Sequence, residues 1–176
     1  STWIETSSEI INLLYDSNYS MEVNYGWNLA SSEWLIRIYL SGGSPREVIF
    51  NDSKIMQAYV FGDGSGNSFR FCVDDNLSNS SSSNHEVSPW FAIDWVGWKL
   101  VSWDMSNDGT GSWIGDGNLD GNMRFDSFQL KYNPGQSQFG KIYIEQFFFS
   151  FTAGETAEPI VIFLNTSHWF EKSWLA

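Results

Sequence analysis

Apolar and aromatic side chains alternate with polar ones along most of the chain, in short runs that end at Gly, Asn, Asp or Ser. An alternation with a period of two places neighbouring side chains on opposite faces, so it predicts β-strands with one buried face. We expect strands over residues 20–27, 33–41, 55–62, 68–74, 90–95, 98–105, 123–132, 141–151 and 158–165. Only residues 7–14 resemble a helical turn. The sequence therefore predicts an all-β antiparallel β-sandwich, a jelly roll of about nine to ten strands.

The length of 176 residues fits one domain, or one domain with an appendage. We expect a jelly-roll domain over residues 1–152. Residues 153–176 are expected to form an extra strand or tail, which packs on this domain or on a neighbouring subunit. Residues 62–67 are interpreted as a hairpin connection and residues 133–135 as a turn, whereas the serine-rich segment 78–84 is expected to be a mobile loop.

The charge balance restricts the classes of partner. The chain carries 21 acidic and 9 basic residues, a net charge of −12. This argues against nucleic acid and against anionic membrane surfaces, while it is compatible with neutral glycans and calcium. No apolar run is long enough for membrane insertion. With one cysteine and two histidines, a zinc cluster or a Cys–His catalytic pair has no support. Richness in Ser, Asn, Gly and Trp predicts a secreted or cell-surface protein.

Aromatic residues are unusually frequent, at 18% of the chain, and include 10 Trp. A core absorbs many aromatic rings, but this number of tryptophans predicts that some reach the surface. The alternation assigns a set of aromatic and polar residues to a second strand face, which would suit stacking on sugar rings and hydrogen bonding to hydroxyls. An ordinary solvated sheet face is the alternative. The set comprises Arg37, Tyr39, Gln57, Tyr59, Arg70, Lys99 and Trp103.

One loop has the spacing of the first half of a calcium-binding loop. Asp116, Asn118 and Asp120 follow the pattern D-x-N-x-D-G, whose alternating oxygens can surround a hard cation. The twelfth position, however, is Ser127 instead of a bidentate Glu. A turn stabilised by Asx hydrogen bonds is therefore the alternative to a metal site.

Catalysis has little support from the sequence. Carboxylates that could pair as acid and base are plentiful, but their spacing selects no pair. They are Asp94, Asp104, Asp126, Glu145 and Glu86. We therefore expect a protein that is not an enzyme.

Four segments together resemble a known family. They are F-G-D-G-S-G-N-S-F-R-F-C-V-D-D, W-V-G-W-K-L-V-S-W-D-M, G-D-G-N-L-D and G-K-I-Y-I-E-Q-F. Their order is similar to that in galactose-binding-like β-sandwich modules, which include the non-catalytic carbohydrate-binding jelly rolls of secreted bacterial glycoside hydrolases. The resemblance covers residues 20–151. It implies a glycan-binding concave face and a structural calcium, for which Glu5 and Glu145 match the family's acidic positions. Gln146 stands where the family has a second acid.

The main hypothesis is non-catalytic carbohydrate binding, with a polysaccharide or oligosaccharide as partner. A structural subunit of an extracellular filament or surface assembly is the alternative, because the strand predicted at residues 158–165 and the aromatic residues after it could mediate self-association. A lyase or hydrolase on the same fold is a third hypothesis, which requires a single essential carboxylate or tyrosine.

Overall fold

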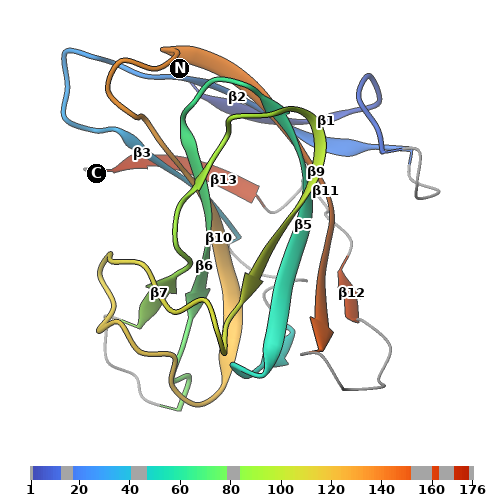
Figure 1. Cartoon of the computed structure of the whole chain (residues 1–176), viewed down its shortest axis with the longest axis vertical. Helices are drawn as coiled ribbons and strands as arrows, with labels where there is room; N and C mark the ends of the chain where they lie inside the picture. The colour runs from blue at the N-terminus through green and yellow to red at the C-terminus, as the bar shows by residue number, and fades with distance from the viewer. Residues whose placement is uncertain are drawn as a thin grey trace.

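The computed structural model describes residues 2–12, 18–40, 47–78, 84–151, 160–162 and 169–174. In these ranges the chain forms strands, turns and irregular segments, with no helical residue. The strands build two antiparallel sheets that pack face to face (Figure 1). This arrangement confirms the predicted all-β sandwich and is compatible with a jelly roll. No helix among the described residues has the length and apolar character of a membrane span.

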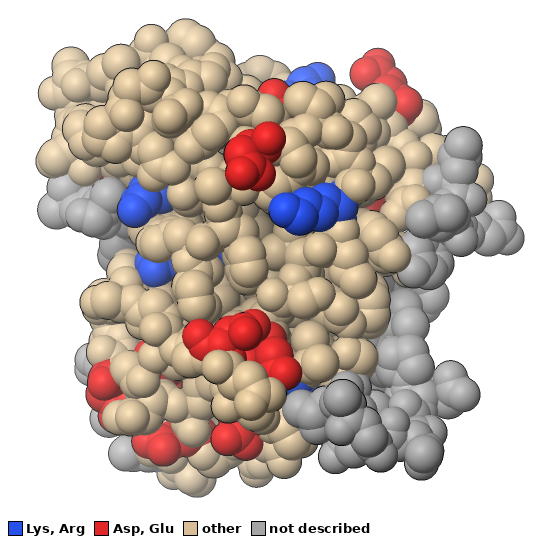
Figure 2. All heavy atoms as spheres, viewed as in Figure 1, with Lys and Arg blue, Asp and Glu red and all other residues tan. Residues whose placement is uncertain are grey.

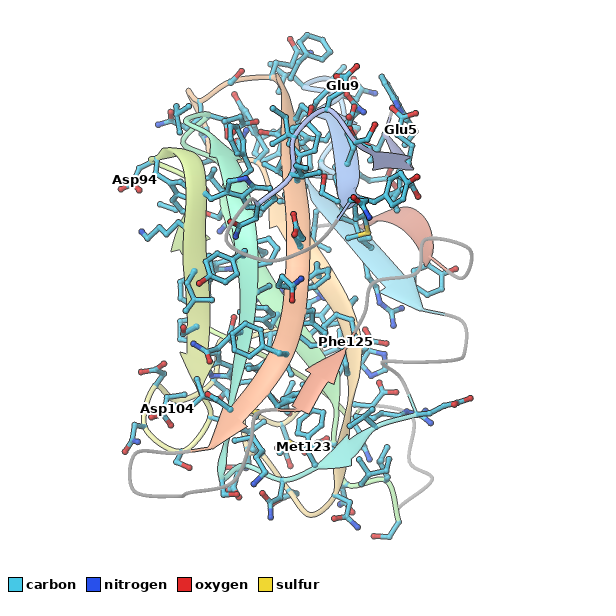
Figure 3. The ribbon with its side chains drawn as sticks, turned by 90° about the vertical axis from the view of Figure 1, so that its right-hand side faces the viewer. Glu5, Glu9, Asp94, Asp104, Met123 and Phe125 are labelled. Atoms are coloured by element: carbon cyan, nitrogen blue, oxygen red, sulfur yellow. The ribbon has the colours of Figure 1, made fainter. Side chains whose placement is uncertain are left out.

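The first sheet has six strands and contains both the N-terminal strand and the longest strand of the chain. Its members are β1 (Trp3–Ser7), β2 (Ser20–Gly26), β5 (Lys54–Asp63), β9 (Val96–Asp104), β11 (Phe139–Phe151) and β12 (Ile160–Ile162). They lie in the order β1-β2-β11-β5-β9, and β12 pairs with the C-terminal part of β11. Figure 3 looks onto this sheet, with β9 as its left-hand edge.

The second sheet has seven strands. Its members are β3 (Leu35–Leu40), β4 (Ile49–Phe50), β6 (Ser68–Asp74), β7 (His85–Val87), β8 (Phe91–Ala92), β10 (Met123–Lys131) and β13 (Trp169–Trp174). They lie in the order β13-β3-β10-β6-β7, while β4 pairs with β10 and β8 with β6.

Phenylalanine rings fill the space between the sheets. Phe125 of β10 and Phe147 of β11 belong to different sheets, and their ring centroids are 4.5 Å apart. Phe128 packs edge-on against the same Phe147 ring at 5.5 Å. Trp103 of β9 is fully buried beside this cluster, and its Nε1 donates to the carbonyl of Gly109 at 2.9 Å. These contacts make the aromatic core the main link between the two sheets.

Two β-bulges change which side chains face this core. In β10 the register shifts between Phe125 and Ser127, so that Phe125 and Phe128, three residues apart, are both buried in the core. In β11 the shift lies between Glu145 and Phe148, where Gln146 has a φ of 53°. An extra residue in one strand reverses the alternation beyond it. Each bulge therefore turns a polar side chain outward and returns the following apolar residues to the core.

Two local predictions are wrong. Residues 62–67 do not form a hairpin, because they connect β5 of the first sheet to β6 of the second. Backbone hydrogen bonds from Gly64 to Trp95 and from Gly66 to Ile93 hold this crossing instead. Within residues 7–12 no helical turn forms, since Trp98 and Glu145 bind this segment through the Ile11 carbonyl and the Asn12 amide. The predicted turn at residues 133–135 is confirmed.

Other expectations fall partly outside the described residues. The serine-rich segment 78–84 is described only at its two ends. Of the C-terminal segment, Ile160–Ile162 pairs with β11, and Trp169–Trp174 pairs with β3 over six residues. Both strands thus complete sheets of their own chain, and β13 covers an edge of β3.

We expect deletion of residues 152–176 to destabilise the domain, because it removes β13 and exposes the edge of β3. At a net value of ~1 kcal/mol for each ladder hydrogen bond, the free energy of unfolding should fall by about 3–6 kcal/mol. Urea denaturation followed by circular dichroism measures this change. A full truncation as stable as the intact chain would show that β13 contributes nothing to the fold.

Candidate functional site

An ion pair lies at the centre of the outer face of the seven-stranded sheet. Asp126 sits at the bulge of β10 and is fully buried, while Arg37 of β3 reaches over it. The Nε of Arg37 donates to Oδ2 at 3.0 Å, and one terminal nitrogen of the same guanidinium donates to Oδ1. Such two-point contacts fix the guanidinium plane as well as its position.

This pairing controls the charge of Asp126. Burial raises the pKa of the carboxyl, but the hydrogen bonds and charge of Arg37, together with His85 and Ser127, outweigh burial. The net effect lowers the pKa of Asp126 below its ordinary value of 3.8. Asp126 is therefore an anion at neutral pH, and it serves to hold Arg37.

A second carboxylate extends the network along the same face. Asp74 of β6 accepts from Nε of Arg124 at 2.9 Å, and its other oxygen lies 3.0 Å from Nδ1 of His85. Nε2 of His85 is 3.3 Å from the Arg37 guanidinium, so the histidine connects the two ion pairs. Asp74, His85 and Asp126 also have ligand atoms within 4.8 Å of one another. Because each carboxylate already binds an arginine, this group suits an ion-pair network better than a dication.

Aromatic rings border the network. The Tyr39 ring centroid lies 4.8 Å from the Arg37 guanidinium carbon, and the Trp113 centroid lies 5.9 Å from it. Trp113 comes from the long connection between β9 and β10, and its ring is also 5.6 Å from the His85 ring. Tyr39 and Trp113 are both partly exposed. Planar rings around fixed polar groups are the usual makeup of a binding surface for amphipathic ligands.

A straight row of side chains continues across the sheet. Gln129 of β10 lies in register with Arg37 on one side and Arg70 on the other. Nε of Arg70 donates to the Gln129 side-chain carbonyl at 2.8 Å, and its Nη1 donates to the Ser112 carbonyl at 3.1 Å. Burial lowers the pKa of Arg70 to about 10, which leaves it charged at neutral pH. The Gln129 side-chain nitrogen is buried without an acceptor among the described residues.

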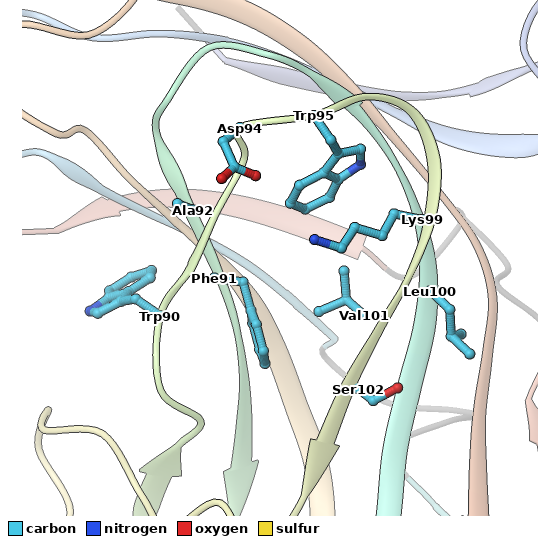
Figure 4. Close-up of a pocket in the computed structure, with 9 residues that line it drawn as sticks. All are labelled: Trp90, Phe91, Ala92, Asp94, Trp95, Lys99, Leu100, Val101 and Ser102. Atoms are coloured by element: carbon cyan, nitrogen blue, oxygen red, sulfur yellow. The ribbon is translucent and has the colours of Figure 1, made fainter.

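The face ends at Trp90, whose ring stacks over Arg70 with 3.8 Å between the centroid and the guanidinium carbon. Next to Trp90, the edges of the two sheets enclose a groove of about 480 Å³ (Figure 4). Trp95 and Lys99 line it as well, with the Lys99 ammonium 4.5 Å from the Trp95 centroid. In Figure 2, drawn from the side of this groove, acidic side chains gather mainly at the lower end of the molecule, where Figure 1 shows the β9–β10 connection.

The residues predicted to share a sugar-binding face lie in three different places. Arg37, Tyr39 and Arg70 belong to the outer face just described. Gln57 and Tyr59 lie on β5 in the other sheet, where they alternate with the core residues Met56, Ala58 and Val60. The prediction of one common face is therefore wrong. β5 belongs to a different sheet from β3 and β6, although polar and apolar residues alternate in the same way in all three strands.

The two remaining residues point toward the core side of β9. Trp103 is 0% exposed and cannot stack on a ligand, so its assignment to a binding face is wrong. Lys99 shares its face of β9 with the core residue Val101, but it lies near the open end of the sandwich and lines the groove. Strand periodicity places Lys99 and Trp103 on one face without showing that this face is the inner one.

The predicted calcium ligands do not form a common site. Glu5 of β1 is exposed and lies in register with Glu22, whereas Glu145 is buried and accepts from the Asn12 amide at 2.7 Å. In the loop, Asp116 Oδ1 accepts from the backbone and side-chain nitrogens of Asn118 at 2.8 and 3.2 Å. This is the Asx turn that was the alternative to a metal site.

Carboxylates around the loop also bind its backbone. Asp75 accepts from the Asp120 amide at 3.0 Å, and Glu86 accepts from the Gly117 amide at 3.0 Å. Burial, with a smaller contribution from neighbouring acidic groups, raises the pKa of both Asp75 and Glu86. Asp116, Asn118 and Asp120 thus serve a loop that is closed by internal hydrogen bonds.

Several residues of the face were not predicted. His85 and Trp113 lie outside the predicted strands, so strand periodicity gave no face for either. In the sequence, Asp126 is one acid among many. Its place could be inferred from the three-residue spacing of Phe125 and Phe128, because a broken alternation is the sequence signal of a bulge. No protein-family model matches the chain, and the comparison with curated proteins gives no match either.

We expect Asp126→Asn to lower the free energy of unfolding at neutral pH by about 3–5 kcal/mol, since it leaves Arg37 without its buried counter-charge. The folded-state pKa of Asp126 is lowered. Its contribution is therefore fully present above its ordinary pKa of 3.8 and is lost as the pH falls through the folded-state value. The difference in the free energy of unfolding between the variant and the wild type should accordingly become smaller below about pH 4.

Urea denaturation of both proteins across this pH range measures the effect. Glu33→Gln, which removes an exposed carboxylate, is the control and should follow the wild type. A stability difference that does not change with pH would contradict the assigned role of Asp126.

Calcium should change the thermal stability little, because Asp116 Oδ1 and the backbone carbonyls of Gly117 and Asp120 already accept internal hydrogen bonds. At about 1 mM calcium, typical for weak extracellular sites, we expect the melting temperature to shift by less than about 2 °C. Differential scanning fluorimetry with calcium and then with a chelator measures this shift. A larger increase that Asp120→Asn removes would establish a calcium site in the loop.

Proposed function

We propose that this protein binds carbohydrate without catalysis, through the outer face of the seven-stranded sheet. The observation that carries the proposal is the Arg37 guanidinium, which Asp126 fixes from below while Tyr39 and Trp113 border it. Sugars present flat apolar ring faces that stack on aromatic rings, and hydroxyls that pair with fixed donors and acceptors. A prearranged surface of this kind reduces the ordering cost of binding.

The row beyond Arg37 supports the face from within, because Gln129 is 0% and Arg70 is 1% exposed. Gln129 has an amide nitrogen without an acceptor among the described residues, and Arg70 is held between the Gln129 side chain and the Ser112 carbonyl. These buried side chains therefore hold the exposed groups of the face in position and do not themselves contact a ligand. Trp90 provides a further ring at the end of the row.

Two features support binding in preference to hydrolysis or elimination. A general acid needs a raised pKa, but the pKa of Asp126 is lowered. Asp74, the other carboxylate of the face, is engaged by Arg124 and His85. Both groups therefore serve to position the basic side chains.

The charge of the chain supports a neutral ligand. A net charge of −12 repels acidic polysaccharides at long range, while the arginines of the face are largely neutralised by Asp74 and Asp126. We therefore propose a neutral polysaccharide or oligosaccharide as the partner and a location outside the cell, where such glycans occur. Assembly into a filament has less support, because β12 and β13 pair within the chain.

The proposal is tested by affinity gel electrophoresis of the whole chain in xylan, mixed-linkage β-glucan, galactomannan and the acidic polygalacturonate. We expect at least one neutral polysaccharide to retard the wild type. Tyr39→Ala and Trp113→Ala should each weaken binding about threefold to tenfold, as expected for one stacking ring. The double variant should not be retarded.

Trp3→Ala is the matched control, because Trp3 is 48% exposed and lies on β1 of the other sheet. It should bind like the wild type. If a polysaccharide retards the double variant as strongly as the wild type, this face is not the binding site. Absence of retardation in every polysaccharide would count against carbohydrate binding itself.

A further inference from the structure

The groove beside the sheet face contains a second tryptophan that is held rigidly. Trp95 packs directly over Gly62, where an added Cβ would lie 2.6 Å from the indole nitrogen. The same nitrogen donates to the Val60 carbonyl at 3.3 Å. Only glycine at position 62 leaves room for the ring, so β5 and Trp95 form a fixed platform at the opening between the sheets.

The groove around Trp95 has the size and chemistry of a ligand site. Its volume of about 480 Å³ lies within the range of about 300–1,000 Å³ that is common for such sites. Asp94 and Lys99 lie at its exposed rim, and Ser102 lines its lower end while its hydroxyl accepts from Nε2 of Gln57 at 2.8 Å. Figure 4 shows Asp94, Trp95 and Lys99 around the upper part of the groove and Ser102 at its lower end.

Trp90 belongs both to this groove and to the sheet face. Its ring lies over Arg70 of the outer face, with the Lys131 ammonium 5.0 Å from the centroid, and the residue also lines the groove. Trp90 is partly exposed, as is Trp95. Trp90 therefore lies between the sheet face and the groove, with the Arg70 guanidinium and the Lys131 ammonium beside its ring.

We propose that the groove is a second glycan subsite, so that the protein binds the interior of an extended neutral polysaccharide and not only its end. This inference rests on the proposed function. One glycan segment stacks at Tyr39 and Trp113, passes Trp90, and reaches Trp95, where Lys99 moves from the ring to bind hydroxyls. A continuous surface with rings at intervals fits a chain of sugars, and the added contacts make the affinity increase with chain length.

The test is isothermal titration calorimetry with the disaccharide and the hexasaccharide of the β-1,4-linked glucan, xylan or mannan backbone that retards the wild type. We expect Trp95→Ala to bind the disaccharide like the wild type and to bind the hexasaccharide about threefold to tenfold more weakly. Lys99→Ala, which changes only an exposed side chain, should show a smaller loss of the same kind. It serves as a second variant in case circular dichroism shows that Trp95→Ala is unfolded.

The controls separate this inference from the proposed function. Tyr39→Ala should weaken the binding of both ligands equally, and Trp3→Ala should weaken the binding of neither. If Trp95→Ala and Lys99→Ala both keep the wild-type increase in affinity from the disaccharide to the hexasaccharide, the groove is not a subsite. The proposal of binding at the sheet face would then still stand. If the wild type itself binds neither ligand nor any polysaccharide, the proposed function fails as well.

Discussion

The stack of phenylalanine rings between the sheets is the constraint on which the rest of the structure depends. Phe125 and Phe147 meet across the sandwich at 4.5 Å, and Phe128 joins them. Burying rings of this size contributes a large share of the hydrophobic free energy, so both sheets must present apolar inner faces. The polar side chains therefore lie on the outer faces, in the loops and at the open edges of the sheets. Both the charged network and the groove lie in these remaining places.

The position of the network follows from the core through one bulge. Phe125 and Phe128 both face inward, and two residues between them must be accommodated on the other side. Asp126 thereby points to the outer face, where Arg37 of the neighbouring strand binds it at two points. Without the extra residue, either Phe128 or Asp126 would be on the wrong side of the sheet. The core packing thus fixes the ion pair, and the ion pair fixes the guanidinium between its rings.

Periodicity in the sequence predicts much of the fold but little of the site. Alternation located β2, β3, β5, β6, β9, β10 and β11, because each has an inner face of large apolar residues. It cannot show which sheet a strand joins, and it therefore assigns Tyr59 and Arg37 to one face although they lie in opposite sheets. In β9 both faces carry apolar rings, Trp98 on one and Trp103 on the other, and nothing local decides which is buried. His85 and Trp113 reach the site only through tertiary packing.

Charge distribution shows why a strongly acidic chain can still offer basic donors. Three of its four arginines, Arg37, Arg70 and Arg124, lie on the one sheet face. Two of them are fixed by carboxylates, and Arg70 is fixed by neutral acceptors and the Trp90 ring. Fixed cations with neighbouring anions form strong local dipoles with a weak long-range field. We propose that such a surface favours hydroxyl groups, which need oriented donors and acceptors nearby, over polyanions, which respond to the net charge of the whole molecule.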